Sequence, residues 1–126
     1  MDKVQHFEIP ANNVEKAKKF YSDVFGWKIA KAPGEMPYWM VYTTEVDDKF
    51  MAKETNVING GLFKKQKDEA VIIVITVGSI DDKLKKIKSA GGKVVMEKQP
   101  VGDMGFYAKF KDTEGNVIGV WENPKK

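Results

Sequence analysis

The sequence contains no cysteine and no arginine, and it has a single histidine. Without cysteine the chain cannot form disulfides, use a thiolate nucleophile or bind a metal through sulfur. All 21 basic residues are lysines, and they are interspersed with the 18 acidic residues rather than gathered in a stripe. Arginine is the usual source of forked contacts to phosphate and guanine. We therefore expect no nucleic-acid partner.

Long apolar runs are also missing. No stretch approaches the roughly eighteen apolar residues that a membrane helix needs, so no membrane partner is expected. The first residues include Asp2 and lack the apolar core of a signal peptide. These features lead us to expect a cytoplasmic protein. The chain has 126 residues, 42% hydrophobic and 31% charged, which suffices for one folded domain.

The first half of the chain has the pattern of one strand, one helix and three further strands. Apolar side chains recur at helical spacing from Val14 to Phe25, after a candidate capping residue at Asn12 or Asn13. A polar loop or short hairpin is expected at 45–56. The expected elements are a strand at 4–10, a helix that ends at Gly26, and strands at 27–30, 38–44 and 58–64.

The second half repeats this order after a charged connector at 65–69. Residues 71–77 form a continuous apolar run, which is typical of a buried strand. Ser79 is placed to cap a helix whose apolar face is Ile80, Leu84 and Ile87. Glycines at 91–92 end that helix. Three more strands are expected at 93–97, 106–111 and 117–121, with turns at 100–105 and 112–116.

The repeated order predicts an α+β fold made of two βαβββ modules, at about 1–65 and 70–126. A gap-free offset of 66 residues aligns Asn13 with Ser79 and Tyr21 with Ile87. Two copies indicate a duplicated module rather than a solenoid. One helix followed by three strands also differs from a doubly wound sheet, where helices alternate with every strand.

Four segments carry a family resemblance. They are H-F-E-I-P-A-N-N-V-E-K-A-K-K-F-Y-S-D-V-F-G-W-K, I-N-G-G-L-F-K, S-A-G-G-K-V-V and F-K-D-T-E-G-N-V-I-G-V-W-E. The chain resembles the glyoxalase / bleomycin resistance / extradiol dioxygenase (vicinal oxygen chelate) superfamily, in a branch related to lactoylglutathione lyase. The resemblance implies a curved mixed sheet that bears a cleft, with the helices on its outer face. It also implies a homodimer.

Metalloenzymes of that superfamily hold one divalent ion, which can be Zn, Ni, Fe, Mn or Mg, on the first and last strands of each module. His6 and Glu122 match two of these positions, whereas Ile72 and Lys64 stand at the other two. Glu8 lies two residues after His6 and therefore on the same face of the strand. The resemblance thus implies that His6, Glu8 and Glu122 either bind a metal ion or, without metal, form an acid/base group.

These residues also have simpler interpretations. His6 and Glu8 can be a hydrogen-bonded polar pair without further function, and Glu122 can be an ordinary residue at a strand end. The candidate ligand-binding residues are aromatic, and one alternating subset of them must face the helices as core. They are Tyr38, Trp39, Tyr42, Phe106 and Tyr107.

Two functions remain open at this stage. The first is a glyoxalase-like lyase or isomerase that acts on a small, oxygen-rich molecule in the cleft, with or without a divalent metal. The second is a metal-free protein that binds and sequesters a small molecule of the antibiotic type. A regulatory module is a third class, but no motif points to it. Metal that co-purifies at about one ion per chain would favour the enzyme.

Overall fold

The computed structural model describes residues 1–49, 51–67 and 69–125. Phe50 and Asp68, which belong to the expected loop and connector, lie outside the described residues. The chain divides into two compact units. The N-terminal unit is His6–Val71, and the C-terminal unit combines Met1–Gln5 with Ile72–Lys126. No helix in the described part of the chain is long and apolar enough to cross a membrane.

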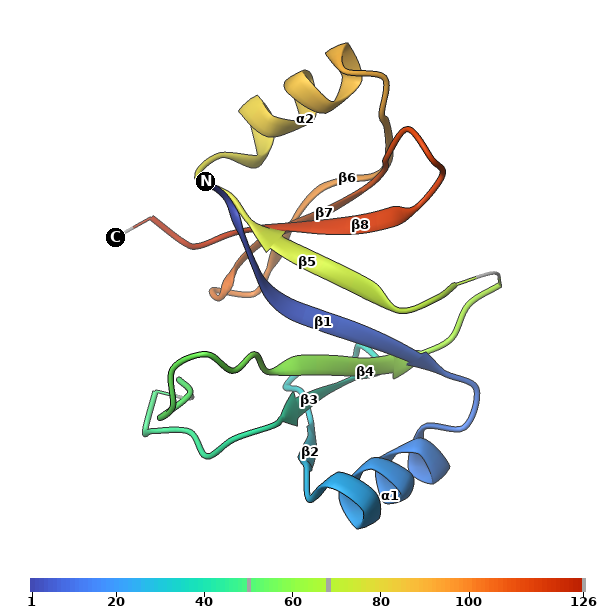
Figure 1. Cartoon of the computed structure of the whole chain (residues 1–126), viewed down its shortest axis with the longest axis vertical. Helices are drawn as coiled ribbons and strands as arrows, with labels where there is room; N and C mark the ends of the chain where they lie inside the picture. The colour runs from blue at the N-terminus through green and yellow to red at the C-terminus, as the bar shows by residue number, and fades with distance from the viewer. Residues whose placement is uncertain (50, 68, 126) are drawn as a thin grey trace. The chain divides into compact units, whose positions relative to one another are not determined.

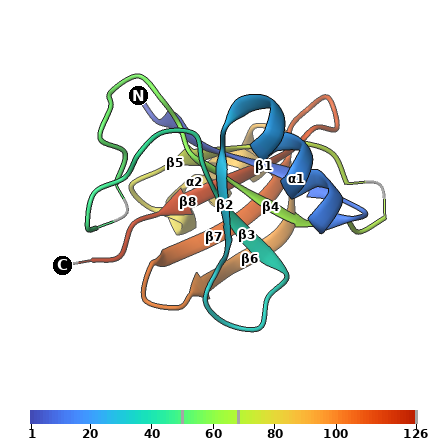
Figure 2. The same ribbon diagram turned by 90° about the horizontal axis from the view of Figure 1, so that it is seen from below.

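The N-terminal unit is built from one helix and four strands, whose order in the sheet is β2-β3-β4-β1. Strands β1 and β4 are parallel, and the other neighbouring pairs are antiparallel. Helix α1 contacts β2 and β4 (Figures 1 and 2). The elements are β1 (Lys3–Ala11), α1 (Val14–Phe25), β2 (Lys28–Lys31), β3 (Tyr38–Tyr42) and β4 (Gly60–Lys64).

Helix α1 begins and ends at the residues that the sequence indicates. The Asn13 side chain accepts a 3.0 Å hydrogen bond from the backbone N–H of Lys16. Gly26 ends the helix in the left-handed conformation, at φ 74°, which glycine adopts without a steric penalty. Between the helix and the sheet lies a core of Val14, Ile29, Val41 and Leu62.

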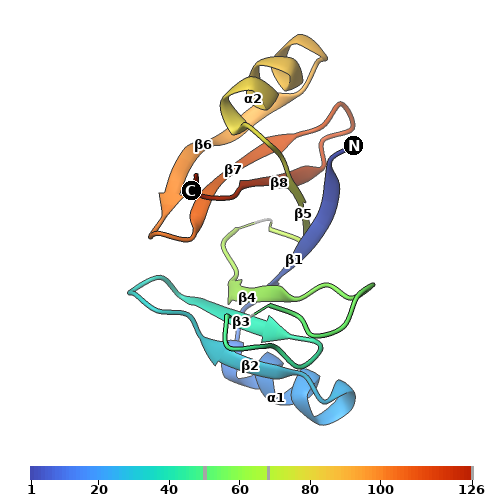
Figure 3. The same cartoon turned by 90° about the vertical axis from the view of Figure 1, so that its left-hand side faces the viewer.

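The C-terminal unit repeats the arrangement, with the strand order β5-β8-β7-β6. Strands β5 and β8 are parallel, and the other pairs are antiparallel. Figure 3 shows α2 beside these strands. The core of the C-terminal unit consists of Val77, Ile80, Leu84, Ala108 and Val120. The elements are β5 (Ile72–Thr76), α2 (Ile80–Ser89), β6 (Lys93–Val101), β7 (Gly105–Lys111) and β8 (Val117–Glu122).

The α+β class and the two βαβββ modules predicted from the sequence are confirmed. One boundary was wrong: a turn was expected from Pro100, but β6 continues to Val101 and pairs Pro100 with Phe106. Strand β6 is the last strand in the order of its unit, and proline is tolerated in such edge strands. The strand also contains two register shifts, which obscure its alternation in the sequence.

Each sheet has one face toward its own helix and one face away from it, which we call the helix-free face. In the N-terminal unit Phe7, Ile9 and Leu62 pack with the α1 core. By alternation, the residues between them occupy the helix-free face. On β1, β3 and β4 these are His6, Glu8, Tyr38, Met40, Tyr42, Gly61 and Phe63.

The strand registers give the equivalent positions of the two units. Glu8 pairs with Gly61, and Gly61 pairs with Met40. In the C-terminal unit Val74 pairs with Gly119, and Gly119 pairs with Lys109. Gly119 is therefore the counterpart of Gly61. Each unit also carries a tyrosine on its third strand, two residues before the residue that pairs with this glycine. These tyrosines are Tyr38, before Met40, and Tyr107, before Lys109.

Candidate active site

Three polar side chains meet on the helix-free face of the N-terminal unit. Strand β1 carries His6 and Glu8, and β3 carries Tyr38. The Nε2 atom of His6 lies 2.7 Å from the Tyr38 hydroxyl oxygen. Tyr38 is also hydrogen-bonded to Glu8. Two residues of one strand and one residue of a strand two places away thus form a continuous hydrogen-bonded chain, which we call the His6–Tyr38–Glu8 chain.

Burial sets the protonation of this cluster. Glu8 is only 7% exposed. Burial lowers the pKa of His6, and the negative charge of Glu8 offsets part of that decrease. Burial also raises the pKa of Tyr38 far above its usual range, with the charge of Glu8 and the hydrogen bond to it acting in the same direction. At neutral pH the imidazole is therefore uncharged and the phenol keeps its proton.

These protonation states fix the direction of the hydrogen bonds. An ionised carboxylate can only accept, so the Tyr38 hydroxyl donates to Glu8. The Tyr38 oxygen then accepts from the protonated Nε2 of His6. In this tautomer the lone pair of the imidazole is on Nδ1. The chain thus holds a neutral histidine as a proton acceptor, with a carboxylate behind it to stabilise the imidazolium.

Gly61 lies directly beneath the Tyr38 hydroxyl. A Cβ atom at Gly61 would lie 1.7 Å from the hydroxyl oxygen of Tyr38 and 2.0 Å from its Cζ. The same relationship occurs in the C-terminal unit, where a Cβ at Gly119 would lie 2.6 Å from the Tyr107 hydroxyl oxygen. No real Cβ atom tolerates such distances. The tyrosine on the third strand therefore occupies the space above a glycine of the last strand in both units.

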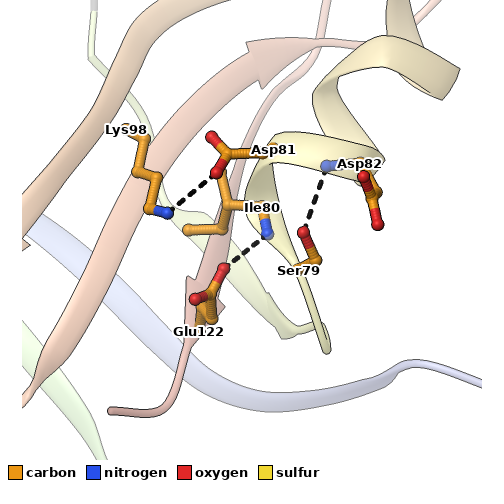
Figure 4. A network of polar contacts seen from close by, with 6 residues as sticks. All are labelled: Ser79, Ile80, Asp81, Asp82, Lys98 and Glu122. Atoms are coloured by element: carbon orange, nitrogen blue, oxygen red, sulfur yellow. Dashed lines mark hydrogen bonds and ion pairs between the residues drawn. The ribbon is translucent and has the colours of Figure 1, made fainter. Parts of the chain in front are cut away.

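Glu122 lies on the helix side of its own unit. Its Oε1 accepts a 2.7 Å hydrogen bond from the backbone N–H of Ile80, the first residue of α2 (Figure 4). It is 5% exposed and shares its strand face with Val120 of the α2 core. In the N-terminal unit the position of Glu122 belongs to Lys64, whose ammonium donates to the backbone oxygen of Asn12 before α1. Both side chains thus bind the segment that leads into a helix.

The donor set decides whether a metal centre fits within either unit. On the helix-free face of the N-terminal unit, β1 supplies one imidazole and one carboxylate, whereas Gly61 and Phe63 of β4 supply no ligand. Among the described residues no group of three or more His, Asp or Glu side chains is placed to hold a metal ion. An ion bound between Nε2 of His6 and Glu8 would also displace the Tyr38 hydroxyl. Neither unit by itself fits the expected metal site, so the assignment of His6, Glu8 and Glu122 as metal ligands stays a prediction.

The five aromatic candidates divide between the two faces of their strands. Tyr38, Tyr42 and Tyr107 are on helix-free faces. Trp39 packs against the α1 core and Phe106 against the α2 core, as alternation requires of one subset. Phe106 and Glu122 also line an open hollow of about 420 Å³ at the ends of β7 and β8. Ligand binding by these residues stays a prediction.

Sequence reasoning missed the two roles that build the site. Tyr38 was expected either to line a ligand cavity or to face the helices as core, and its place at the centre of the hydrogen-bonded chain was not foreseen. No role in positioning a side chain was expected of Gly61. A signal for both was available, because the alignment of G-L-F-K at 61–64 with G-V-W-E at 119–122 places a glycine at the same strand position twice.

Comparison with known proteins gives a family and a fold. The model of the Glyoxalase/Bleomycin resistance protein/Dioxygenase superfamily matches residues 3–120. A glyoxylase-like domain-containing protein of Didymella fabae is 30% identical over 98% of this chain and 95% of its own length.

Among solved structures, a hypothetical protein from Bacillus halodurans C-125 superposes with a TM-score of 0.68 at 15% identity, covering 99% of this chain and 96% of that chain. A Streptomyces coelicolor methylmalonyl-CoA epimerase in complex with 2-nitronate-propionyl-CoA superposes with a TM-score of 0.67 at 14% identity, covering 98% of each chain. At these identities the two likenesses show the fold alone.

Proposed function

Because the chain belongs to the Glyoxalase/Bleomycin resistance protein/Dioxygenase superfamily, we propose that it is a glyoxalase-like enzyme that moves a proton on a small carbonyl compound. The observation that supports this proposal is the His6–Tyr38–Glu8 chain. It joins a neutral imidazole to a buried carboxylate through a phenol that keeps its proton. A buried group with a perturbed pKa beside a charged partner is typical of an acid/base site.

In the proposed step His6 acts as the base. A C–H bond next to a carbonyl breaks, its electron pair delocalises onto the carbonyl oxygen as an enolate, and the proton passes to Nδ1 of His6. Tyr38 and Glu8 stabilise the imidazolium through the hydrogen bonds that they already make. The imidazolium then returns the proton to carbon. Lyase, isomerase and epimerase reactions of carbonyl compounds all contain such a step.

The substrate panel follows from this chemistry. It contains an α-hydroxyaldehyde, a 2-oxo acid, a hemithioacetal of a thiol with a 2-oxoaldehyde, and a branched acyl-CoA thioester. The last compound is included because a solved epimerase with this fold is named for an acyl-CoA. In all four compounds a C–H bond next to a carbonyl group can lose its proton to give an enolate. A single hydrogen-exchange assay therefore covers the whole panel.

Hydrogen exchange in D₂O tests the proposal. The proton on an imidazolium exchanges with solvent, so an enzyme of this kind replaces the substrate C–H by C–D, which proton NMR detects as loss of the C–H signal. We expect exchange with at least one member of the panel and a fall of about 10²- to 10⁴-fold in His6→Gln, the usual contribution of a positioned base. Exchange at the same rate in His6→Gln would contradict the proposal.

A second candidate function is small-molecule binding without chemistry. The three tyrosines of the helix-free faces, Tyr38, Tyr42 and Tyr107, favour it, because aromatic rings with hydroxyl groups suit flat, polar ligands. A ligand that raises the melting temperature of the protein but undergoes no exchange in D₂O would support sequestration over catalysis. The homodimer implied by the resemblance stays a prediction in either case.

A further inference from the structure

Gly61 has a role that neither its strand position nor the family match assigns. We infer that Gly61 is a positioning residue, whose lack of a side chain lets the Tyr38 hydroxyl sit between His6 and Glu8. The inference rests on the hydrogen-bonded chain used in the proposed function, but it concerns how that chain is assembled. It can therefore hold or fail whether or not the protein catalyses proton transfer.

The first argument is steric. A Cβ atom at Gly61 would lie 1.7 Å from the Tyr38 hydroxyl oxygen, so the tyrosine ring could not keep its present place. The conflicting atoms are the far end of a tyrosine ring, which can rotate away at lower cost than a backbone can move. Any larger residue at 61 would therefore expel the hydroxyl from its place beside Nε2 of His6, which is now 2.7 Å away.

The second argument comes from the equivalent position in the C-terminal unit. Tyr107 covers Gly119 as Tyr38 covers Gly61. There, however, the two first-strand positions that correspond to His6 and Glu8 are Ile72 and Val74. A tyrosine above a glycine is thus a feature of both modules, because an aromatic ring compensates for a missing side chain in a sheet. In the N-terminal unit this arrangement brings the hydroxyl between two titratable groups, His6 and Glu8.

The comparison supplies a matched control. Gly61→Ala and Gly119→Ala introduce the same methyl group on equivalent strands, beneath equivalent tyrosines. A purely structural role predicts that both variants lose stability and neither changes the titration of His6. A positioning role predicts that Gly61→Ala alone changes it. His6 is the only histidine of the chain, so its ring signals in proton NMR report one pKa without assignment.

The direction of the change follows from the cause of the present shift. Burial is the main reason that the pKa of His6 is lowered. Moving the Tyr38 ring aside would admit water to the imidazole and let Glu8 act on it directly, and both effects raise the pKa. In Gly61→Ala we expect the pKa of His6 to rise toward its ordinary value of 6.5. Gly119→Ala should leave it unchanged.

If Gly61→Ala does not fold, a double-mutant cycle with Tyr38→Leu still tests whether Gly61 acts through Tyr38. Leucine lacks the ring atoms that a methyl at 61 would meet, so Gly61→Ala should have little further effect on folding or on the pKa of His6 in the Tyr38→Leu background. Equal effects of Gly61→Ala in both backgrounds would overturn the inference. So would a Gly61→Ala protein that folds and keeps the wild-type pKa of His6. If proton exchange is found for no substrate while the pKa of His6 shifts as expected, the proposed function fails and the positioning role stands.

Discussion

The carboxylate of Glu122 binds the backbone N–H of Ile80 at 2.7 Å, at the N-terminus of α2. The first N–H groups of a helix have no partner within the helix, and their partial positive charge favours an anion. Ser79 satisfies a different group, the N–H of Asp82, at 3.2 Å. Two side chains thus bind backbone N–H groups at the start of α2. One is the N-cap residue Ser79, and the other is Glu122, which lies 42 positions after Ile80 in the sequence.

Removal of this carboxylate should destabilise the protein. Ile80 is fully buried, so in Glu122→Ala its N–H loses its partner without access to water. We expect a loss of about 1–3 kcal/mol in the free energy of unfolding, measured by urea denaturation. Glu122→Gln keeps an acceptor oxygen and should lose less.

Ser79→Ala is the matched control, because it removes the other side chain that binds the start of α2. Loss of an N-cap typically costs about 1 kcal/mol, so both variants should destabilise the protein while His6 titrates as in the wild type. A Glu122→Ala protein of unchanged stability would show that the contact between Glu122 and Ile80 does not stabilise the fold.

The order of the elements could be predicted from the sequence because each boundary is local. Asn13, Gly26 and Ser79 determine the helix ends through contacts within a few residues. Phe7 and Ile9 lie toward the helix, as the alternation of side chains along a strand requires. The end of β6 could not be predicted, since Pro100 and two register shifts break the pattern and only pairing with β7 continues the strand.

The site was harder to predict from the sequence than the fold, because it depends on contacts between strands rather than on local patterns. Alternation requires that Glu122 share a face with Val120, but it does not show that this face is the one that contacts α2. The contact between Tyr38 and His6 joins residues that are 32 positions apart, and it depends on the register of β3, β4 and β1. No local pattern encodes that register, although the repeated glycine at 61 and 119 is a trace of it.

Metal analysis is the direct test of the ligand set implied by the family resemblance. The described residues of each unit do not place three ligands around one ion, so we expect protein purified without chelator to hold well under one divalent ion per chain, in wild type and in His6→Ala alike. About one ion per chain in the wild type, lost in both His6→Ala and Glu122→Ala, would instead establish the metal site.

Stability should depend on pH through His6. The pKa of His6 is lowered in the folded state, so between that value and 6.5 the unfolded chain binds more protons, and stability decreases as the pH falls through this window. In His6→Gln this part of the dependence should disappear when unfolding by urea is compared at pH 7 and pH 5. The pKa of the Asp112 carboxyl is lowered below 3.8, chiefly by its hydrogen bond to Asn116, so it acts only in more acidic solution. An unchanged slope in His6→Gln would show that other groups produce the dependence.

Tyr38 should affect proton exchange more than its counterpart in the other unit. Tyr38→Phe keeps the ring above Gly61 but removes the hydroxyl that links His6 to Glu8. The loss of a hydrogen bond to a charged group should slow exchange about 10- to 100-fold. Tyr107→Phe removes the equivalent hydroxyl in the C-terminal unit, whose sequence contains no histidine, and is the matched control. Similar losses in both variants would indicate that the hydroxyls act in ligand binding rather than in the His6–Tyr38–Glu8 chain.

The charge of Glu8 should be visible in the titration of His6. Glu8 raises the pKa of His6 against the larger, opposite effect of burial. Glu8→Gln removes the charge but keeps a similar shape, so the pKa of His6 should fall further below 6.5 and the pH at which exchange is half-maximal should fall with it. Glu15→Gln, on the exposed first turn of α1, removes the same charge elsewhere and should change neither. A parallel decrease in the NMR titration and in the exchange profile would identify His6 as the base, because only that group changes its protonation in both measurements. If the NMR titration moves and the exchange profile does not, another group controls the rate, and His6 is part of the binding surface rather than the acceptor of the proton.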